Sequence, residues 1–479
     1  MTRLFKNFIG GEWVGGDTAA DNINPSNTDD VVGTYVRASR TDAQLAIDSA
    51  KAAFANWSKS NPQTRHDVLK KVADEILSRK AELGELLARE EGKTLPEAVG
   101  EVARAGQIFA FFSGEALRQS GEKLASVRAG VEVDITREPL GVIGVITPWN
   151  FPIAIPAWKI APALCYGNTV VFKPAELVTG SAWALAEILS RSGLPAGVFN
   201  LVMGHGRDVG QTLLDHRDVT ALTFTGSVAT GMRVAQACVQ RMAKFQLEMG
   251  GKNPLVVLDD ANLSSAVENA VNGAFYSTGQ RCTASSRLIV TAGVYDEFVA
   301  ALVDRTKALV VDDALKAGSH IGPVVDAAQL EQNQSYLRIA QDEGATLLWG
   351  GERMMRDTPG FYMAPAIFTD CTNRMRVCQE EVFGPIVSVI RVSDYEEALA
   401  VANDTPFGLA AGICTTSLKY ANHFKQHAEA GMVMVNLPTA GVDYHVPFGG
   451  RKGSSYGPRE QGRYAAEFFT STKTAYVLP

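Results

Sequence analysis

The stretch Leu222-Thr223-Phe224-Thr225-Gly226-Ser227-Val228-Ala229-Thr230-Gly231 shows a pattern that recurs along the chain. A short apolar run leads into a glycine turn, and the residues after the turn favour a helix. Further apolar runs of this kind lie at residues 142–146, 169–172, 255–258, 287–290 and 387–392. Because short apolar strands that alternate with helices build parallel sheets covered on both faces, the sequence predicts an α/β fold.

The length and composition of the chain limit the classes of protein to which it can belong. A single hydrophobic core rarely grows beyond about 250–300 residues, so a chain of 479 residues is expected to hold at least two large domains. A net charge of −7 argues against a phosphate-backbone partner, so no nucleic acid is expected. No apolar run approaches the roughly 18 residues of a membrane span. Residues 1–16 show no signal pattern. The predicted location is therefore the cytoplasm, without a membrane partner.

Further elements are predicted around these strands. They are a strand at residues 5–13, helices at 41–57, 65–92 and 264–276, and a half-exposed strand at 131–137. Gly92 reads as the stop signal of the second helix. We place the boundary between two α/β domains near residues 248–253, where Gly250 and Gly251 form a hinge.

The six cysteines of the chain lie at positions 165, 238, 282, 371, 378 and 414. None forms a Cys-x-x-Cys pair or lies at metal-ligand spacing from a histidine, so no metal site is predicted. By default, such a cysteine is a small buried apolar residue. Cys282 differs because it follows a glycine turn and the cation of Arg281, which favours the reactive thiolate. A covalent mechanism needs this nucleophile and a separate base.

Two further residues suit the chemistry of such a nucleophile. Glu248 lies in an apolar, glycine-rich segment, where desolvation raises the pKa of a carboxyl group toward the working pH of a general base. Its alternative is a solvated glutamate at a helix end. Asn150 lies in a loop fixed by two prolines, and its amide can donate a hydrogen bond to a developing oxyanion.

A nucleotide site is indicated at the ends of two predicted strands. Lys173 and Glu176 follow the run at 169–172, at the sheet edge where α/β proteins bind ligands. A carboxylate accepts hydrogen bonds from ribose hydroxyls and repels a 2′-phosphate, which favours NAD over NADP. Gly226 and Ser227 open a helix whose free N–H groups suit a pyrophosphate. The alternatives are a surface ion pair and a plain tight turn.

Seven segments, in their order along the chain, resemble those of the aldehyde dehydrogenase superfamily. They are Thr147-Pro148-Trp149-Asn150-Phe151-Pro152, Lys173-Pro174-Ala175-Glu176, Phe224-Thr225-Gly226-Ser227, Leu247-Glu248-Met249-Gly250-Gly251-Lys252, Gly279-Gln280-Arg281-Cys282, Glu380-Glu381-Val382-Phe383-Gly384-Pro385 and Pro447-Phe448-Gly449-Gly450. Each is weak alone, but together they are specific and cover nearly the whole chain.

The resemblance implies a domain plan. Family members carry a variant Rossmann cofactor domain, an α/β catalytic domain and a small β extension that builds dimers, often paired into tetramers. We therefore expect a homo-oligomer. The expected bounds are 1–120 and 140–250 for the cofactor domain, 251–449 for the catalytic domain, and 121–139 with 464–479 for the extension, in which residues 472–477 look strand-like.

The resemblance also implies residue roles. Cys282 is implied as the nucleophile, Glu248 as the general base, and Asn150 with the backbone N–H of Cys282 as the oxyanion hole. The implied cofactor residues are Thr147, Trp149, Lys173 (counted also with the catalytic group), Glu176, Gly226, Ser227, Glu381 for the nicotinamide ribose and Phe383 near its ring. The implied cofactor is NAD, with NADP possible.

The implied reaction oxidises an aldehyde to a carboxylic acid. The Cys282 thiolate attacks the aldehyde carbon to give a thiohemiacetal, and loss of hydride to the nicotinamide leaves a thioester. Glu248 activates the water that releases the acid. Because Glu248 is present, hydrolysis is favoured over transfer to coenzyme A.

For the substrate, residues 279–287 and 454–462 resemble dehydrogenases of 2-oxoglutarate semialdehyde (2,5-dioxopentanoate). An acidic semialdehyde needs a cation for its distal carboxylate, and Arg281 is the candidate. The alternative for Arg281 is a structural ion pair.

Other aldehydes stay open. Enzymes for succinic semialdehyde place arginines where this chain has Trp158 and Tyr276. The residues predicted to line an apolar funnel are Phe151, Trp158, Tyr276 and Tyr444. Succinic or glutaric semialdehyde and an uncharged aliphatic or aromatic aldehyde therefore remain alternatives.

Two other classes of function fit the residues less well than a dehydrogenase. A cofactor-independent thiol hydrolase or acyltransferase would pair Cys282 with a histidine, and none of the seven histidines shows a familiar pairing context. A non-catalytic binding protein of the same fold would not need Cys282, Glu248 and Asn150 together.

Overall fold

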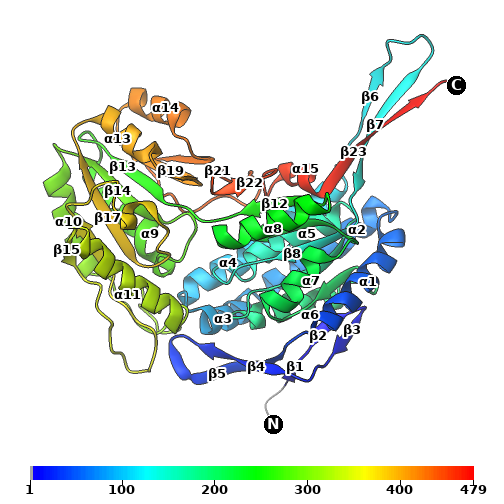
Figure 1. Cartoon of the computed structure of the whole chain (residues 1–479), viewed down its shortest axis with the longest axis horizontal. Helices are drawn as coiled ribbons and strands as arrows, with labels where there is room; N and C mark the ends of the chain where they lie inside the picture. Colours follow the sequence, from blue (N-terminus) through cyan, green and yellow to red (C-terminus); the bar gives the residue numbers. More distant parts are fainter. Residues whose placement is uncertain (1–3) are drawn as a thin grey trace.

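Two large sheets with helices on both faces dominate the computed structural model, which describes residues 4–479 (Figure 1). The first sheet has the strand order β22-β12-β11-β8-β9-β10-β2-β3. Its strands are β2 (Asn7–Ile9), β3 (Glu12–Val14), β8 (Val142–Ile146), β9 (Thr169–Lys173), β10 (Phe199–Leu201), β11 (Val219–Thr225), β12 (Lys244–Glu248) and β22 (Ser455–Tyr456). Five of its neighbouring strands, from β12 to β10, pair in parallel.

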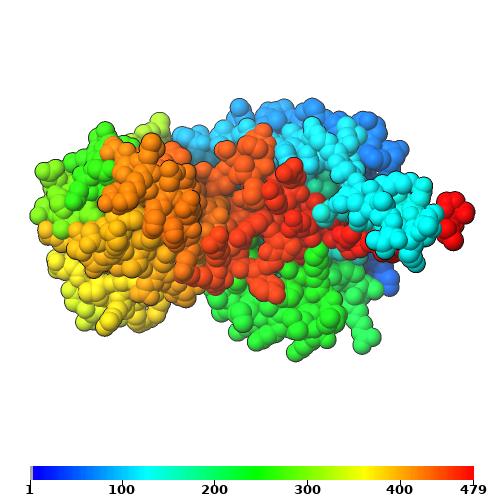
Figure 2. Space-filling model, turned by 90° about the horizontal axis from the view of Figure 1, so that it is seen from above, coloured from blue at the N-terminus to red at the C-terminus, as the bar shows by residue number. Residues whose placement is uncertain are grey.

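The second sheet has the order β15-β16-β17-β14-β13-β19-β20. Its strands are β13 (Asn253–Val257), β14 (Ser285–Thr291), β15 (Thr346–Trp349), β16 (Ala366–Thr369), β17 (Ile386–Val392), β19 (Ala410–Cys414) and β20 (Met432–Val435). The chain passes from the first sheet to the second between β12 and β13, at residues 249–252. It returns near the end, where β22 pairs with β12. Figure 2 shows this C-terminal part, in red, lying across the middle of the molecule.

Helices cover each sheet because their apolar stripes pack on its two faces. The first sheet carries on one face α2 (Pro62–Ser78), α3 (Lys80–Glu91), α4 (Leu95–Ala116), α5 (Ala154–Cys165) and α6 (Thr179–Ser190), and on the other α1 (Arg40–Trp57), α7 (Gln211–Asp215) and α8 (Val228–Gln240). The second carries α9 (Leu263–Phe275) and α10 (Tyr295–Lys307) on one face and α11 (Ala327–Asp342), α13 (Tyr395–Asn403) and α14 (Leu418–His427) on the other.

The predicted α/β class with parallel sheets is confirmed, and two predicted elements were wrong. Residues 65–92 form two helices, because α2 ends at Ser78 and α3 begins at Lys80. Gly92 does cap α3 in the left-handed conformation, with a φ of 96°. Residues 5–13 are not one strand, since Gly10 and Gly11 turn the chain between β2 and β3.

A three-stranded arm projects from the body (Figure 1). It consists of β6 (Glu122–Ala125), β7 (Glu132–Pro139) and β23 (Thr470–Val477), and β23 pairs with β7 along its whole length. The predicted strands at 131–137 and 472–477 are thus confirmed. Val127, Tyr476 and Leu478 are exposed on this arm.

The smaller sheets complete the fold. One joins β1 (Leu4–Phe5), β4 (Ala19–Asn24) and β5 (Asn27–Val36), and the other joins β18 (Phe407–Gly408) and β21 (Arg451–Lys452). Among residues 4–479, no helix is long and apolar enough to cross a membrane.

Candidate active site

The parallel strands of the first sheet bring three predicted segments to one edge. Ile146 of β8 pairs with Phe224 of β11, and Thr225 pairs with Glu248 of β12. The loops that follow these strands therefore leave the sheet side by side. Their predicted residues, Asn150, Gly226 and Glu248, gather at the carboxyl ends of the strands, where such sheets bind ligands.

Cys282 comes from the second sheet, on a loop held in an unusual backbone conformation. Ser277, Thr278 and Gly279 have φ values of 51°, 57° and 66°. Glu97 Oε1 accepts hydrogen bonds from Ser277 N at 2.9 Å and Ser277 Oγ at 3.0 Å. A Cβ on Gly279 would lie 2.2 Å from the carbonyl oxygen of Gly384. Strain of this kind persists only where the surroundings impose it, and here it fixes the approach to the thiol.

Two cavities meet at Cys282. The first, of about 410 Å³, is lined by Cys282 together with residues of α4, α5 and the loops at 277–283 and 438–448. The second, of about 300 Å³, is lined by Cys282 together with Asn150, Gly226, Ser227 and Glu381. Both volumes suit a small molecule. The thiol can therefore face one ligand from each side.

The thiol is not activated by Arg281 in this structure. Burial, followed by the negative charges of Glu381 and Glu248, raises the pKa of Cys282 to about 12. Arg281 instead donates from Nη2 to Glu97 Oε1 at 2.8 Å. The expectation that Arg281 lowers the pKa of the thiol is therefore wrong. Arg281 is paired with Glu97, whereas Cys282 is buried near Glu381 and Glu248.

Asn150 is held by a network that the sequence did not reveal. Its Nδ2 donates to the carbonyl oxygen of Gln280 at 3.0 Å, next to the nucleophile loop. The buried Lys93 donates from Nζ to the backbone oxygen of Asn150 and to Glu101 Oε2, each at 2.7 Å. Glu101 Oε1 accepts from the N–H groups of Ile153 and Ala154 at the start of α5. The only sequence signal was a lysine just before the capping box of α4.

Glu248 has the surroundings that the sequence predicted. It is 2% exposed, and Ser455 Oγ donates to its Oε2 at 2.5 Å. Burial, and then the negative charge of Glu460, raise the pKa of Glu248 well above its usual value. Glu460 itself forms a buried ion pair with Lys159. A Cβ on Gly449 would lie 2.8 Å from Glu248 Oε1, so glycine leaves room for the carboxylate.

The second cavity gathers the predicted cofactor residues. Gly226 and Ser227 lie at the start of α8, and Trp149 packs edge-on against Phe383 with ring centroids 5.3 Å apart. Glu381 Oε1 accepts from Gly251 N at 2.9 Å, and burial raises the pKa of Glu381 to about 7. A Cβ on Gly250 would lie 2.2 Å from Glu381 Oε2, so the glycine pair makes space for this carboxylate.

Three predicted cofactor residues lie away from this cavity wall. Thr147 is buried, and Lys173 donates from Nζ to the carbonyl oxygen of Pro174 at 2.8 Å. Burial lowers the pKa of Lys173. The exposed Glu176 pairs with His205, whose Nδ1 lies 2.5 Å from Glu176 Oε2. Their contacts with a ribose stay predictions.

The predicted substrate residues divide into two groups. Phe151, Trp158 and Arg281 line the first cavity. Tyr276 packs against the apolar cluster of α9 and α10, and Tyr444 packs against Phe111 with ring centroids 6.4 Å apart. These two tyrosines lie outside the cavity wall. For both, packing in the protein core is the default role of a tyrosine among apolar residues.

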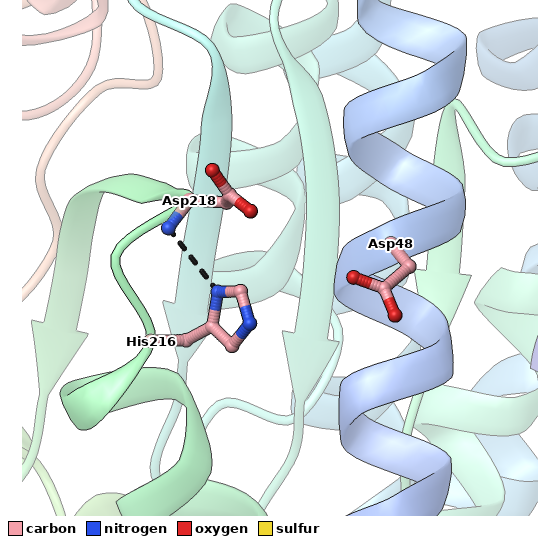
Figure 3. Close-up of side chains that lie close together, drawn as sticks. All are labelled: Asp48, His216 and Asp218. Carbon is pink, nitrogen blue, oxygen red and sulfur yellow. Dashed lines mark hydrogen bonds between the residues drawn. The ribbon is translucent and has the colours of Figure 1, made fainter.

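One group of side chains in the described range has the composition of a metal site (Figure 3). It consists of Asp48 on α1 with His216 and Asp218, near the surface. Its ligand atoms already have partners. His216 Nδ1 accepts from Asp218 N at 3.1 Å, His216 Nε2 lies 2.7 Å from the Gln44 amide, and Asp218 pairs with Lys51. The group therefore carries no metal assignment.

Comparisons with known proteins agree with this geometry. Residues 13–475 match the model of the aldehyde dehydrogenase family. The chain is 45% identical to alpha-ketoglutaric semialdehyde dehydrogenase of Bacillus subtilis, over 100% of this chain and 99% of the relative. It is 39% identical to 2,5-dioxopentanoate dehydrogenase of Saccharolobus solfataricus, over 95% of each chain.

A solved structure has the same fold and a cofactor. It is betaine aldehyde dehydrogenase of Staphylococcus aureus in complex with NAD+, which is 34% identical, has a TM-score of 0.96 and matches 99% of this chain and 94% of its own. Together with the meeting of two cavities at Cys282, these matches show that the chain belongs to the aldehyde dehydrogenase family.

Proposed function

We propose that this aldehyde dehydrogenase oxidises 2-oxoglutarate (alpha-ketoglutarate) semialdehyde to 2-oxoglutarate with NAD. The observation that carries the reaction type is the position of Cys282 at the junction of two cavities. The choice of aldehyde is supported by the names of the relatives from Bacillus subtilis and Saccharolobus solfataricus.

The residues divide the work of the reaction. Cys282 attacks the aldehyde carbon as its thiolate. Because the pKa of the free thiol is high, its proton must first pass to a base, and Glu248, whose negative charge acts on Cys282, is the base that we assign to this step. The Nδ2 of Asn150 and the backbone N–H of Cys282 stabilise the oxyanion that forms. The raised pKa of Glu248 suits a general base that takes a proton from the water that hydrolyses the thioester.

The second cavity fits NAD. Thr225 Oγ1, beside Gly226, is buried without a hydrogen-bond partner, as expected for an atom that awaits a ligand. The N-terminus of α8 at Ser227 suits the pyrophosphate, and Glu381 suits ribose hydroxyls. Trp149 and Phe383 would flank the nicotinamide end. When bound, the nicotinamide accepts the hydride. NADP is the alternative cofactor.

The remaining proposals concern assembly and organisation. The arm of β6, β7 and β23 presents an exposed sheet with apolar side chains, which supports a homo-oligomer, a dimer or a tetramer. The change of sheet at residues 249–252 supports a cofactor domain at 1–120 and 140–250 and a catalytic domain at 251–449. The free thiol of Cys282 suits the reducing cytoplasm.

An aldehyde panel tests the proposal. NADH formation at 340 nm is measured with 2-oxoglutarate semialdehyde, succinic semialdehyde, glutaraldehyde, pentanal and benzaldehyde, with NAD and with NADP. We expect 2-oxoglutarate semialdehyde with NAD to give the highest kcat/KM. A higher kcat/KM for pentanal or benzaldehyde would contradict the proposed substrate.

A further inference from the structure

The wall of the substrate cavity carries one cation more than its carboxylates can pair. Lys93 pairs with Glu101 at 2.7 Å, and Arg281 pairs with Glu97 at 2.8 Å. The fifth charged residue of the wall, Arg104, has no ion-pair partner among residues 4–479. Arg104 lies on α4, which also supplies Glu97 and Glu101. The five charged residues of the wall therefore sum to one net positive charge, and the cation without an ion pair is Arg104, on which Glu101 and Asp443 act without a direct contact.

Hydrogen-bond donors without acceptors gather around this guanidinium. Arg104 Nη2 donates to Gln461 Oε1 at 3.2 Å. Arg104 Nε, Trp158 Nε1 and Gln461 Nε2 are buried without any partner. The Cζ of Arg104 lies 5.7 Å from the ring centroid of Trp158. A buried donor left unpaired costs about 1–3 kcal/mol. Two of these three donors, Arg104 Nε and Trp158 Nε1, belong to residues that line the substrate cavity, where a ligand can supply the missing acceptor.

A carboxylate matches this group of donors. The planar fork of an arginine binds the two oxygens of a carboxylate, and an arginine stays charged at neutral pH even where burial lowers its pKa, as it does for Arg104. Arg104 and Trp158 line the same cavity as Cys282. A ligand with an aldehyde at one end and a carboxylate at the other can therefore occupy both.

We propose that Arg104, with the indole N–H of Trp158, binds the distal carboxylate of an acidic semialdehyde while Cys282 receives its aldehyde carbon. This inference rests on the proposed function and names the residue that gives the selectivity. It assigns to Arg104 the role of carboxylate anchor that was predicted for Arg281. The guanidinium of Arg281 already donates a hydrogen bond to Glu97.

The test compares two arginine variants. Arg104→Met and Arg281→Met are assayed with 2-oxoglutarate semialdehyde and with pentanal, which has the same number of carbons and no carboxylate. For Arg104→Met, we expect the ratio of kcat/KM for the semialdehyde over pentanal to fall by about 100-fold, the effect of losing one partner of a desolvated charge pair. For Arg281→Met, we expect the two kcat/KM values to fall together, because its ion pair holds the nucleophile loop.

A second measurement does not depend on turnover. In this measurement iodoacetamide is used to alkylate Cys282, and 2-oxoglutarate should protect the wild type and fail to protect Arg104→Met. If Arg104→Met does not fold, Trp158→Phe keeps an aromatic ring but lacks the indole N–H, and should lower the ratio by about 20-fold, the worth of one hydrogen bond to a charged group. Thermal unfolding and NAD binding report whether each variant is folded.

The outcomes separate the two proposals. If the wild type prefers pentanal, the proposed substrate fails, and loss of protection by 2-oxoglutarate in Arg104→Met would still support a carboxylate site. If the wild type prefers the semialdehyde but Arg104→Met keeps the wild-type ratio and protection, the inference is overturned. A selective loss in Arg281→Met would then place the anchor at that residue.

Discussion

Glu97 binds Arg281 in the wall of the substrate cavity, with Glu97 Oε1 at 2.8 Å from Arg281 Nη2. The same oxygen accepts from the backbone and hydroxyl of Ser277, and Oε2 caps α4 at Thr94. One carboxylate thus joins the start of α4 to the loop that carries Cys282. The ion pair therefore stabilises the loop that carries Cys282. It also leaves Arg281 without a free guanidinium for the substrate.

Glu97→Gln should therefore affect stability and catalysis together. We expect the free energy of unfolding to fall by about 2 kcal/mol, since the partly buried Arg281 loses its counter-charge. We expect kcat to fall about tenfold as the loop loosens. Denaturant unfolding and steady-state kinetics measure both. Glu268→Gln is the control, because Glu268 forms a more exposed pair with Arg305 and should change little. Wild-type values for Glu97→Gln would contradict this role.

The contact of Lys93 with the backbone of Asn150 predicts a coupled effect. Lys93→Met should lower kcat about 30-fold, because the amide of Asn150 shifts from the oxyanion. Asn150→Ala should lower kcat by about 100-fold or more. The double variant should be no slower than Asn150→Ala, since both changes remove one function. Multiplied losses in the double variant would show that Lys93 acts independently of Asn150.

The surroundings of Glu248 predict the pH dependence of thioester hydrolysis. Glu248 must be ionised to act as the base, so activity is lost as pH falls through its raised pKa. Glu460→Gln removes a negative charge that raises this pKa, so the acidic limb of the kcat profile should move to lower pH. Ser455→Ala removes a hydrogen bond that lowers the pKa, so the limb should move to higher pH. Shifts in the same direction would contradict the assignment.

The nucleophile itself can be titrated without substrate. Because the pKa of Cys282 is about 12, its rate of alkylation by iodoacetamide should rise with pH up to at least pH 10 without a plateau in the free enzyme. Glu381→Gln removes the first of the two negative charges that raise this pKa, so alkylation at pH 8 should become faster. Glu380→Gln is the control, since Glu380 pairs with Arg376 and Tyr336. An equal increase in both variants would contradict the electrostatic account.

Much of the fold could be predicted because parallel strands are buried on both faces. The run at 142–146 coincides with β8, and 169–172 misses only Lys173 of β9. The break between α2 and α3 could not be predicted, because Ser78, Arg79 and Lys80 include no glycine or proline.

Site residues could be predicted where their neighbours in the sequence also surround the side chain in the structure. Glu248 is flanked by apolar and glycine residues, and its predicted raised pKa is confirmed. Arg104 was not predicted, because a single arginine on an amphipathic helix looks like a solvated charge. Its hydrogen-bond partner Gln461 is 357 residues away in sequence. The partner of Glu176 is likewise distant, since His205 belongs to another loop.

The most direct test of the central claim traps the covalent intermediate. Glu248→Gln is mixed with NAD and 2-oxoglutarate semialdehyde, quenched in acid and analysed by mass spectrometry, with NADH followed at 340 nm and Cys282→Ser as the control. The account predicts a burst of about one NADH per subunit, an acyl adduct on Cys282 and slow release of acid, because the thiol can still lose its proton to solvent and attack, while hydrolysis has lost its base. Steady NADH formation without an adduct, or equal turnover by Cys282→Ser, would contradict it.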